Sequence, residues 1–196
     1  MISARRPLDR VGDAVRGVTR WVTGVLHPRR RARARQWLVA GGPPQTILVI
    51  CYGNICRSPY AAAALRRLLP PEASSVRIDS AGFVGAHRSP PANAIEVAAA
   101  RGIDLRRHIS RVVSPGAVAG SDLIIVMEPG QADMLARLGR TRRPILVLAD
   151  LDPRPSRDRR IKDPVDQPRL VFAECYDRVD RCLAEFVNTI WGGRTA

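Results

Sequence analysis

From residue 46 onward the chain alternates short apolar runs with segments of helical pattern, and this alternation restricts the fold more than any other feature. The predicted strands are residues 46–50, 76–80, 122–127 and 144–149. Helices are predicted at 59–69, 91–101 and 130–138, followed by a last helix whose apolar face carries Phe172, Cys175, Val179, Cys182, Phe186 and Ile190. Strands that alternate with helices indicate an α/β sheet with right-handed crossovers. Ligands of such sheets bind beyond the carboxyl ends of the strands.

Residues 1–45 differ in composition from the rest of the chain. They hold ten arginines against two aspartates, and so carry more than half of the net charge of +14. Five valines between Val11 and Val25 recur at spacings of three and four, which predicts a helix. We expect Pro28 to end that helix and residues 41–44 (GGPP) to form a linker. The expected organisation is therefore a basic extension at 1–45, helical or partly disordered, and one α/β domain at 46–196.

The charge of the extension leaves three interpretations open. It is a solvated or disordered tail, a helix that docks on an anionic membrane surface through residues 1–40, or a segment that packs on the domain. Nucleic acid is not an expected partner, because few aromatic residues are interleaved with the arginines and no nucleic-acid-binding motif is present.

Other features of the sequence bear on where the protein acts. It has no apolar run of the about 18 residues that a membrane span requires, and no continuous apolar core of a signal peptide. Its four cysteines do not resemble the disulfide framework of a small secreted protein. We therefore predict a cytoplasmic protein, peripheral at the membrane if the extension docks there.

The first predicted strand leads directly into the segment Cys51-Tyr52-Gly53-Asn54-Ile55-Cys56-Arg57-Ser58-Pro59. Five residues separate Cys51 from Arg57, so a compact loop brings the sulfur and the guanidinium to the same tetrahedral anion. Gly53 and Asn54 tolerate left-handed backbone angles, which turn successive N–H groups inward to form an anion-binding nest. Arg57 binds two oxygens of a phosphate at once, which a lysine does less well. The segment therefore predicts a phosphate site.

The same surroundings activate Cys51 as a nucleophile. We expect Ser58 to cap a helix that begins at Pro59, and the positive amino-terminal end of that helix points at the loop. Helix amino termini and cationic neighbours favour the thiolate form of a cysteine. We therefore expect a Cys51 thiolate that accepts a hydrogen bond from Ser58. Its attack on phosphorus gives a phosphocysteine, while the nest and Arg57 stabilise the equatorial oxygens.

This loop resembles the signature loop of the low-molecular-weight protein tyrosine phosphatases. Over roughly residues 46–190, weaker matches follow in the order of that family: Ser80-Ala81-Gly82, GIDLRRHISR at 102–111, DLIIVME at 122–128, and an Asp-Pro pair before the last helix. The resemblance implies a three-layer sandwich with a four-stranded parallel sheet. It also implies hydrolysis of phosphotyrosine in a protein substrate, or of other aryl phosphate monoesters, without a metal or another cofactor.

The resemblance assigns roles to individual residues. Cys51 is the nucleophile, Arg57 binds the phosphate, and Asp163 is the general acid that later activates water. Phosphate or another oxyanion is bound by Tyr52, Gly53, Asn54, Ile55, Cys56, Arg57 and Ser58. A supporting network of hydrogen bonds consists of Asn54, Ser58, Ser80 and His108. The chain departs from the family at Val165, where a tyrosine often follows the Asp-Pro pair, and Tyr52 is a candidate for an aromatic edge of the cleft.

Rival assignments remain within the same chemistry. Asp152-Pro153 is a second Asp-Pro pair that competes with Asp163 for the role of acid. The related protein-arginine phosphatases tend to carry threonine where this chain has Ile55, and the bulkier apolar residue favours an aromatic substrate. Cys56 is either a small buried residue or a redox partner that forms a reversible disulfide with Cys51.

Two alternatives lie further away. The thioredoxin-coupled arsenate reductases share the phosphate loop and use two further cysteines, for which Cys175 and Cys182 are candidates. Their spacing on the apolar face of the last helix favours core packing instead. A catalytically idle anion-binding module, recruited through its basic extension, is the alternative that is not an enzyme.

Overall fold

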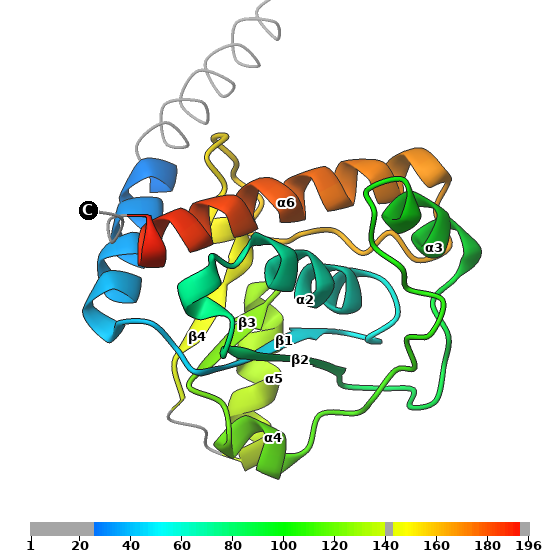
Figure 1. Cartoon of the computed structure of the whole chain (residues 1–196), viewed down its shortest axis with the longest axis horizontal. Helices are drawn as coiled ribbons and strands as arrows, with labels where there is room; N and C mark the ends of the chain where they lie inside the picture. The colour runs from blue at the N-terminus through cyan, green and yellow to red at the C-terminus, as the bar shows by residue number, and fades with distance from the viewer. Residues whose placement is uncertain (1–25, 140–142, 193–196) are drawn as a thin grey trace, which may run out of the picture.

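The computed structural model describes residues 26–139 and 143–192, whose arrangement is drawn in Figure 1. Within these ranges the sheet has four parallel strands in the order β2-β1-β3-β4. The strands are β1 (Thr46–Cys51), β2 (Arg77–Gly82), β3 (Leu123–Val126) and β4 (Ile145–Val147). The expected fold class, a three-layer sandwich around a four-stranded parallel sheet, is confirmed.

Helices cover both faces of the sheet (Figure 1). One face carries α2 (Arg57–Leu68), α3 (Ala92–Ala99) and α6 (Arg169–Trp191), and the other carries α4 (Pro115–Ala119) and α5 (Pro129–Gly139). Two short 3₁₀ helices lie at Pro71–Ala73 and Leu148–Leu151. The apolar stripe predicted for the last helix is buried where α6 packs along α2.

Successive residues of β1 pack on opposite sides of the sheet, because side chains alternate along a strand. Ile47 and Val49 join the larger core, with α2 and α6, whereas Leu48 and Ile50 join a smaller core with Leu135 of α5. All four β1 residues are at most 3% exposed. A strand buried on both faces is apolar at every position, which explains the continuous run at 46–50.

Most predicted elements are confirmed within a few residues, and the exceptions have physical causes. The run at 144–149 leaves the sheet after Val147 and continues as the 3₁₀ helix Leu148–Leu151. Leu148 and Leu151 are both fully buried, and apolar burial alone does not separate a strand from a short helix. Helix α4 escaped prediction because none of its residues is buried, so it leaves no apolar pattern.

A further helix, over residues 26–41, packs against α6. Arg31 and Arg35 both pair with Glu185 of α6, at 2.7 and 3.2 Å. Leu38 is buried in the same core as α2 and α6. This part of the extension is therefore attached to the domain. No helix in the described part of the chain combines the length and the apolar character that a bilayer span needs.

The expectation that Pro28 ends a helix is wrong, since Pro28 lies inside the helix over residues 26–41. Proline is tolerated in the first turn of a helix, and Pro28 is the third described residue of this one. His27, next to it, is buried, and its Nε2 lies 2.9 Å from the carbonyl oxygen of Asp152. The helix predicted between Val11 and Val25 lies outside the described residues.

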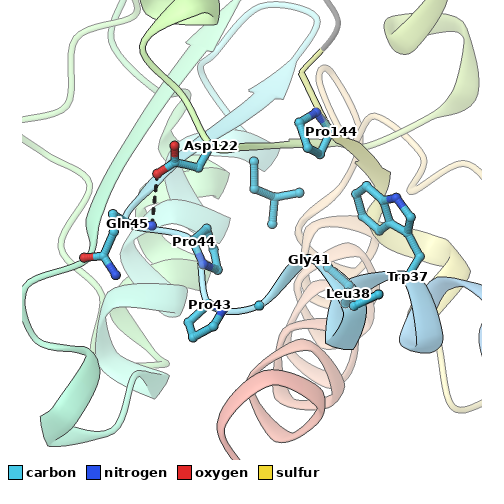
Figure 2. Close-up of a pocket in the computed structure, with 11 residues that line it drawn as sticks. Trp37, Leu38, Gly41, Pro43, Pro44, Gln45, Asp122 and Pro144 are labelled. Atoms are coloured by element: carbon cyan, nitrogen blue, oxygen red, sulfur yellow. Dashed lines mark hydrogen bonds between the residues drawn. The ribbon is translucent and has the colours of Figure 1, made fainter.

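The linker that follows this helix lines a pocket of about 550 Å³ at the amino-terminal ends of the strands. Gly42 has a φ of +70°, a left-handed conformation that commonly ends helices. Figure 2 shows Trp37 and Leu38 on one side of the pocket and Asp122 on the other. The Asp122 carboxylate accepts hydrogen bonds from the backbone N–H groups of Gln45 and Thr46, at 3.1 and 2.9 Å. This pocket lies at the opposite end of β1 from Cys51.

Candidate active site

The predicted nucleophile loop connects the carboxyl end of β1 to the amino terminus of α2. Cys51 is the last residue of β1, and α2 begins at Arg57. In the parallel register Cys51 lies opposite Gly82, the last residue of β2. A Cβ atom at Gly82 would lie 2.7 Å from the carbonyl oxygen of Tyr52 and 2.8 Å from the backbone nitrogen of Asn54. The glycine of the Ser80-Ala81-Gly82 segment is therefore needed for the loop to pack against β2.

Two donors approach the sulfur of Cys51. The backbone N–H of Asn54 donates to Sγ at 3.3 Å, and the hydroxyl of Ser58 lies 3.0 Å from it. The side-chain amide of Asn54 already donates to Ser58 Oγ, at 2.9 Å, so the hydroxyl keeps its own hydrogen for another acceptor. Both contacts, together with the positive end of α2, stabilise a negatively charged sulfur.

Ser58 does not cap α2, contrary to the expectation from the sequence. The helix begins two residues earlier than predicted, and its N-cap is Cys56, which makes no side-chain capping hydrogen bond. The Ser58 hydroxyl is fully buried between Cys51 and Asn54, and so it is engaged at the site. A bound anion would satisfy the free N–H groups of the first helical turn in place of a cap.

The four predicted supporting residues lie together behind the loop. Asn54 is fully buried and has a left-handed φ of 52°. Its amide nitrogen donates to Ser58 and to Ser80 Oγ, at 2.9 and 3.0 Å, and its amide oxygen accepts from the backbone N–H of Arg111 at 2.9 Å. His108 Nε2 lies 2.8 Å from the carbonyl oxygen of Asn54. The network therefore holds the turn in which the Asn54 N–H points at the sulfur.

The tautomer of His108 follows from its partner. A carbonyl oxygen only accepts, so Nε2 carries the hydrogen and donates it to Asn54. Burial lowers the pKa of His108 from its ordinary value, against the opposing effect of that hydrogen bond. His108 is thus a neutral donor that braces the loop.

Arg57 is a buried cation, 1% exposed, at the start of α2. Its Nη1 donates to the carbonyl oxygen of Ile161 at 3.0 Å, and its Nη2 is bonded to the carboxylate of Asp163. The carboxylate of Glu128, just beyond β3, lies 3.6 Å from Nη1. The buried Nε of Arg57 has no hydrogen-bond partner within the described residues. An unsatisfied buried donor on a cation is a position that an oxyanion would satisfy.

The two Asp-Pro pairs, which compete for the role of general acid, lie in different surroundings. Asp163 lines the same pocket as Cys51 and contacts Arg57. Asp152 is 1% exposed and accepts from both Arg178 and Arg181 at 2.8 Å. Burial opposes its ionisation, but the hydrogen bonds from Arg181 and from a backbone N–H outweigh this and lower the pKa of Asp152. Asp152 therefore holds α6 against the segment around residue 152 and does not line the pocket of Cys51.

The pocket that holds Cys51 has a volume of about 190 Å³. Its lining residues are Cys51, Tyr52, Gly53, Ile55, Cys56, Val84, Arg88, Asp163 and Val165. The loop residues Asn54 and Ser58 are predicted to bind phosphate, but both are fully buried and lie behind this surface. The larger pocket of Figure 2 has no cysteine, histidine or arginine in its lining. Chemistry, and not size, thus identifies the candidate active site.

Three residues at the site were not foreseen from the sequence. Val84 and Arg88 follow β2, and Glu128 follows β3. They come after the carboxyl ends of the two strands that flank β1, where ligands of parallel sheets bind. This rule predicts which edge of the sheet binds a ligand, but it does not identify individual residues.

The remaining cysteines are poor nucleophiles. Burial raises the pKa of Cys56 well above its ordinary value, and nearby Asp163 adds to the effect. Burial also raises the pKa of Cys175 and of Cys182 to about 12. Both of these lie on the inner face of α6, 6% and 0% exposed, as expected for core residues.

Known proteins similar in sequence to this chain are phosphatases, which agrees with the phosphate-binding geometry of the site. The family model described as low molecular weight phosphotyrosine protein phosphatase matches residues 46–193. The probable low molecular weight protein-tyrosine-phosphatase EpsP of Ralstonia nicotianae is 46% identical over 89 residues, which cover 44% of this chain and 58% of that relative. The low molecular weight protein-tyrosine-phosphatase Wzb of Escherichia coli K12 is 31% identical over 148 residues, covering 74% of this chain and 94% of Wzb.

Solved structures share the fold. Vibrio vulnificus Wzb in complex with benzylphosphonate superposes with a TM-score of 0.64 at 28% identity, covering 74% of this chain and 97% of that one. The YwlE arginine phosphatase from Geobacillus stearothermophilus superposes with a TM-score of 0.66 at 25% identity, covering 77% and 96%. The match of the family model to three quarters of the sequence, which includes the Cys51 loop, places this chain in the low molecular weight phosphotyrosine protein phosphatase family of enzymes.

Proposed function

We propose that this chain hydrolyses phosphotyrosine in proteins, or related aryl phosphate monoesters, through a phosphocysteine intermediate. The observation that carries the proposal is that Cys51, with two donors to its sulfur, shares one small pocket with Asp163. In the first step Cys51 Sγ attacks phosphorus, so that a P–S bond forms as the bond from phosphorus to the phenolic oxygen breaks. Asp163 in its protonated form gives its proton to the leaving oxygen.

The second step returns the enzyme to its starting state. Asp163, now a carboxylate, accepts a proton from a water molecule whose oxygen attacks phosphorus. The P–S bond breaks, inorganic phosphate leaves, and the Ser58 hydroxyl donates to the departing sulfur. Arg57 and the N–H groups of the loop over residues 52–58 stabilise the equatorial oxygens in both steps. On substrate binding, Arg57 exchanges its contact with Asp163 for the phosphate oxygens. No metal or other cofactor takes part.

The walls of the pocket favour an aromatic leaving group. Tyr52 and Val84 are 50% and 38% exposed at its rim, and Ile55 and Val165 are partly buried. These side chains offer apolar contact to a phenyl ring. The Vibrio vulnificus Wzb structure holds benzylphosphonate, an oxyanion joined to an aromatic ring. Phosphotyrosine has the same two parts.

Dephosphorylation of arginine is the second candidate, because an arginine phosphatase is among the structural neighbours. Ile55, which lines the pocket, is the position at which that branch tends to carry threonine. The two functions are separated by measuring kcat/KM on matched phosphotyrosine and phosphoarginine peptides. We expect a higher kcat/KM for the phosphotyrosine peptide, and we expect Ile55→Thr to reduce the ratio of the two kcat/KM values. A preference for phosphoarginine in the unaltered protein would overturn the assignment.

The basic test of the proposal is phosphate release from a phosphotyrosine peptide by the full chain and by Cys51→Ser. We expect activity to fall by roughly a thousandfold or more while the circular dichroism spectrum and the Tm are kept. Full activity in Cys51→Ser would sink the proposal. Arsenate reduction coupled to thioredoxin is checked in parallel with Cys175→Ser, and we expect no such activity to depend on this buried thiol.

A cytoplasmic location, with a peripheral position at an anionic membrane, remains a prediction. Arg29 and Arg33 on the helix over residues 26–41 are exposed and have no acidic partner within the described ranges. They support the prediction as cations free to meet anionic headgroups. Because Leu38 of that helix is part of the core, the informative variant is Arg29→Gln/Arg33→Gln and not a deletion of residues 1–40. Equal sedimentation of this variant and the unaltered chain with anionic vesicles would contradict it.

A further inference from the structure

Arg88 is the cation at the rim of the active-site pocket that the reaction above does not use. It lies in the loop after β2, is exposed, and lines the pocket together with Val84 and Tyr52. Asp163 stands at the same pocket, but it contacts Arg57. Within the described residues, no carboxylate pairs with Arg88. The rim therefore carries a positive charge that the protein does not neutralise.

The guanidinium of Arg88 is held in place by backbone carbonyl groups. Nε donates to Gly85 at 2.9 Å, and Nη2 donates to Gly53 and to Val84, both at 3.1 Å. One of these carbonyls belongs to the nucleophile loop itself. A Cβ atom at Gly53 would lie 2.8 Å from Nη2, so any side chain at position 53 would displace the guanidinium from this place. Carbonyl oxygens are neutral acceptors, and they orient the cation without cancelling its charge.

The loop that carries Arg88 is itself fixed to the domain through Ser110, which is 1% exposed. The Ser110 hydroxyl accepts from the backbone N–H of Arg88 at 2.9 Å and donates to the carbonyl oxygen of Gly85 at 2.6 Å. The backbone N–H of Ser110 donates to the Arg88 carbonyl at 2.9 Å. The side chain is thus ordered before a substrate arrives, which reduces the entropy lost when it binds one.

We propose that Arg88 determines specificity by binding an acidic side chain next to the phosphotyrosine in the substrate. The inference rests on the proposed function and names the sequence context that this site selects. Nη1 of Arg88 makes no hydrogen bond within the described part of the chain, and the residue is exposed at the rim of the pocket. A flanking glutamate or aspartate supplies the carboxylate that Arg88 lacks, while the phosphotyrosine ring enters between Tyr52 and Val84.

The test compares two phosphotyrosine peptides that differ only in flanking glutamates or glutamines. An exposed charge pair predicts a kcat/KM ratio of about two to five in favour of the acidic peptide at low ionic strength, falling toward one in roughly 0.5 M salt. The ratio should fall to about one in Arg88→Gln and be partly kept in Arg88→Lys. The control Arg106→Gln removes another exposed arginine, paired with Asp104 away from the pocket, and should keep the ratio.

The ratio separates this inference from the proposed function. If the unaltered chain hydrolyses both peptides equally well, or if Arg88→Gln keeps the preference, the role of Arg88 is refuted while the phosphatase assignment stands. If neither peptide nor p-nitrophenyl phosphate is hydrolysed, the proposed function fails. A change in overall rate that is the same for both peptides would show that Arg88 only supports the loop through Gly53, and this outcome also refutes the inference.

Discussion

Replacing Asn54 by alanine tests whether one side chain holds the nucleophile loop in shape. The substitution removes three side-chain hydrogen bonds, to Ser58, Ser80 and the Arg111 N–H. Each contributes a net of about 1 kcal/mol to stability. The left-handed φ of 52° costs an alanine roughly 1 kcal/mol more than an asparagine. The expected loss in the free energy of unfolding is therefore about 4 kcal/mol, or a Tm lower by roughly 10 °C for a chain of this size.

Comparison with Asn54→Gly separates the loss of hydrogen bonds from the cost of the left-handed backbone conformation. Glycine also lacks the hydrogen bonds but accepts the left-handed conformation, so we expect it to be more stable than the alanine variant by about 1 kcal/mol. Urea unfolding and thermal unfolding of the three proteins give the energies, and kcat with p-nitrophenyl phosphate should fall in both variants because the N–H donor to Cys51 moves. An alanine variant within 1 kcal/mol of the unaltered chain, or one at least as stable as the glycine variant, would show that the Asn54 side chain does not hold the loop in shape.

Three further predictions follow from buried groups. Asp152→Asn should lower the free energy of unfolding by about 3 kcal/mol, since it leaves Arg178 and Arg181 without their buried carboxylate. Asp163→Asn should lose activity with a smaller loss of stability, because the Asp163 side chain is 34% exposed and Glu128 also lies near Arg57; the opposite pattern would exchange the roles of the two Asp-Pro pairs. Burial lowers the pKa of His108 in the folded chain, so on acidification the histidine takes up a proton more readily in the unfolded chain. The free energy of unfolding should therefore fall as the pH drops below about 6.5. Urea unfolding at pH 7.5 and 5.5 should show a larger loss in the unaltered chain than in His108→Gln, and equal losses would contradict a neutral His108. Iodoacetamide at pH 7 should alkylate Cys51 before the other cysteines, whose pKa values burial raises; mass spectrometry that finds Cys175 or Cys182 modified first would contradict this.

The parts of the site that the sequence predicted are those joined by short stretches of chain. Cys51, Asn54 and Ser58 lie within eight residues, so local geometry alone brings them together once β1 and α2 are recognised. Apolar patterns located these two elements, because β1 is buried on both faces. The start of α2 was misplaced because the Ser58 hydroxyl is used at the sulfur and not at the helix end.

The remaining parts depend on contacts between distant segments. The choice between Asp152 and Asp163 is decided by Arg178 and Arg181 of α6, which bury the former. Carbonyl groups in two separate loops hold the Arg88 guanidinium at the pocket, and no pattern of residues in the sequence predicts this contact. Arg31 and Arg35 read as part of a charged run, but Glu185 of α6 binds both of them. Such pairings follow from the packed structure and leave no periodic signal in the sequence.

In the proposed reaction the phosphoryl group passes through a covalent bond to Cys51. This step is tested most directly by rapid acid quenching of Asp163→Asn during turnover of p-nitrophenyl phosphate, whose leaving group needs little protonation, followed by mass spectrometry of the peptides. We expect the phosphoenzyme to accumulate with the phosphate on the peptide that contains Cys51, and we expect Cys51→Ser in the same background to abolish this label. Turnover without any phosphoenzyme, or a label on another residue, would contradict it.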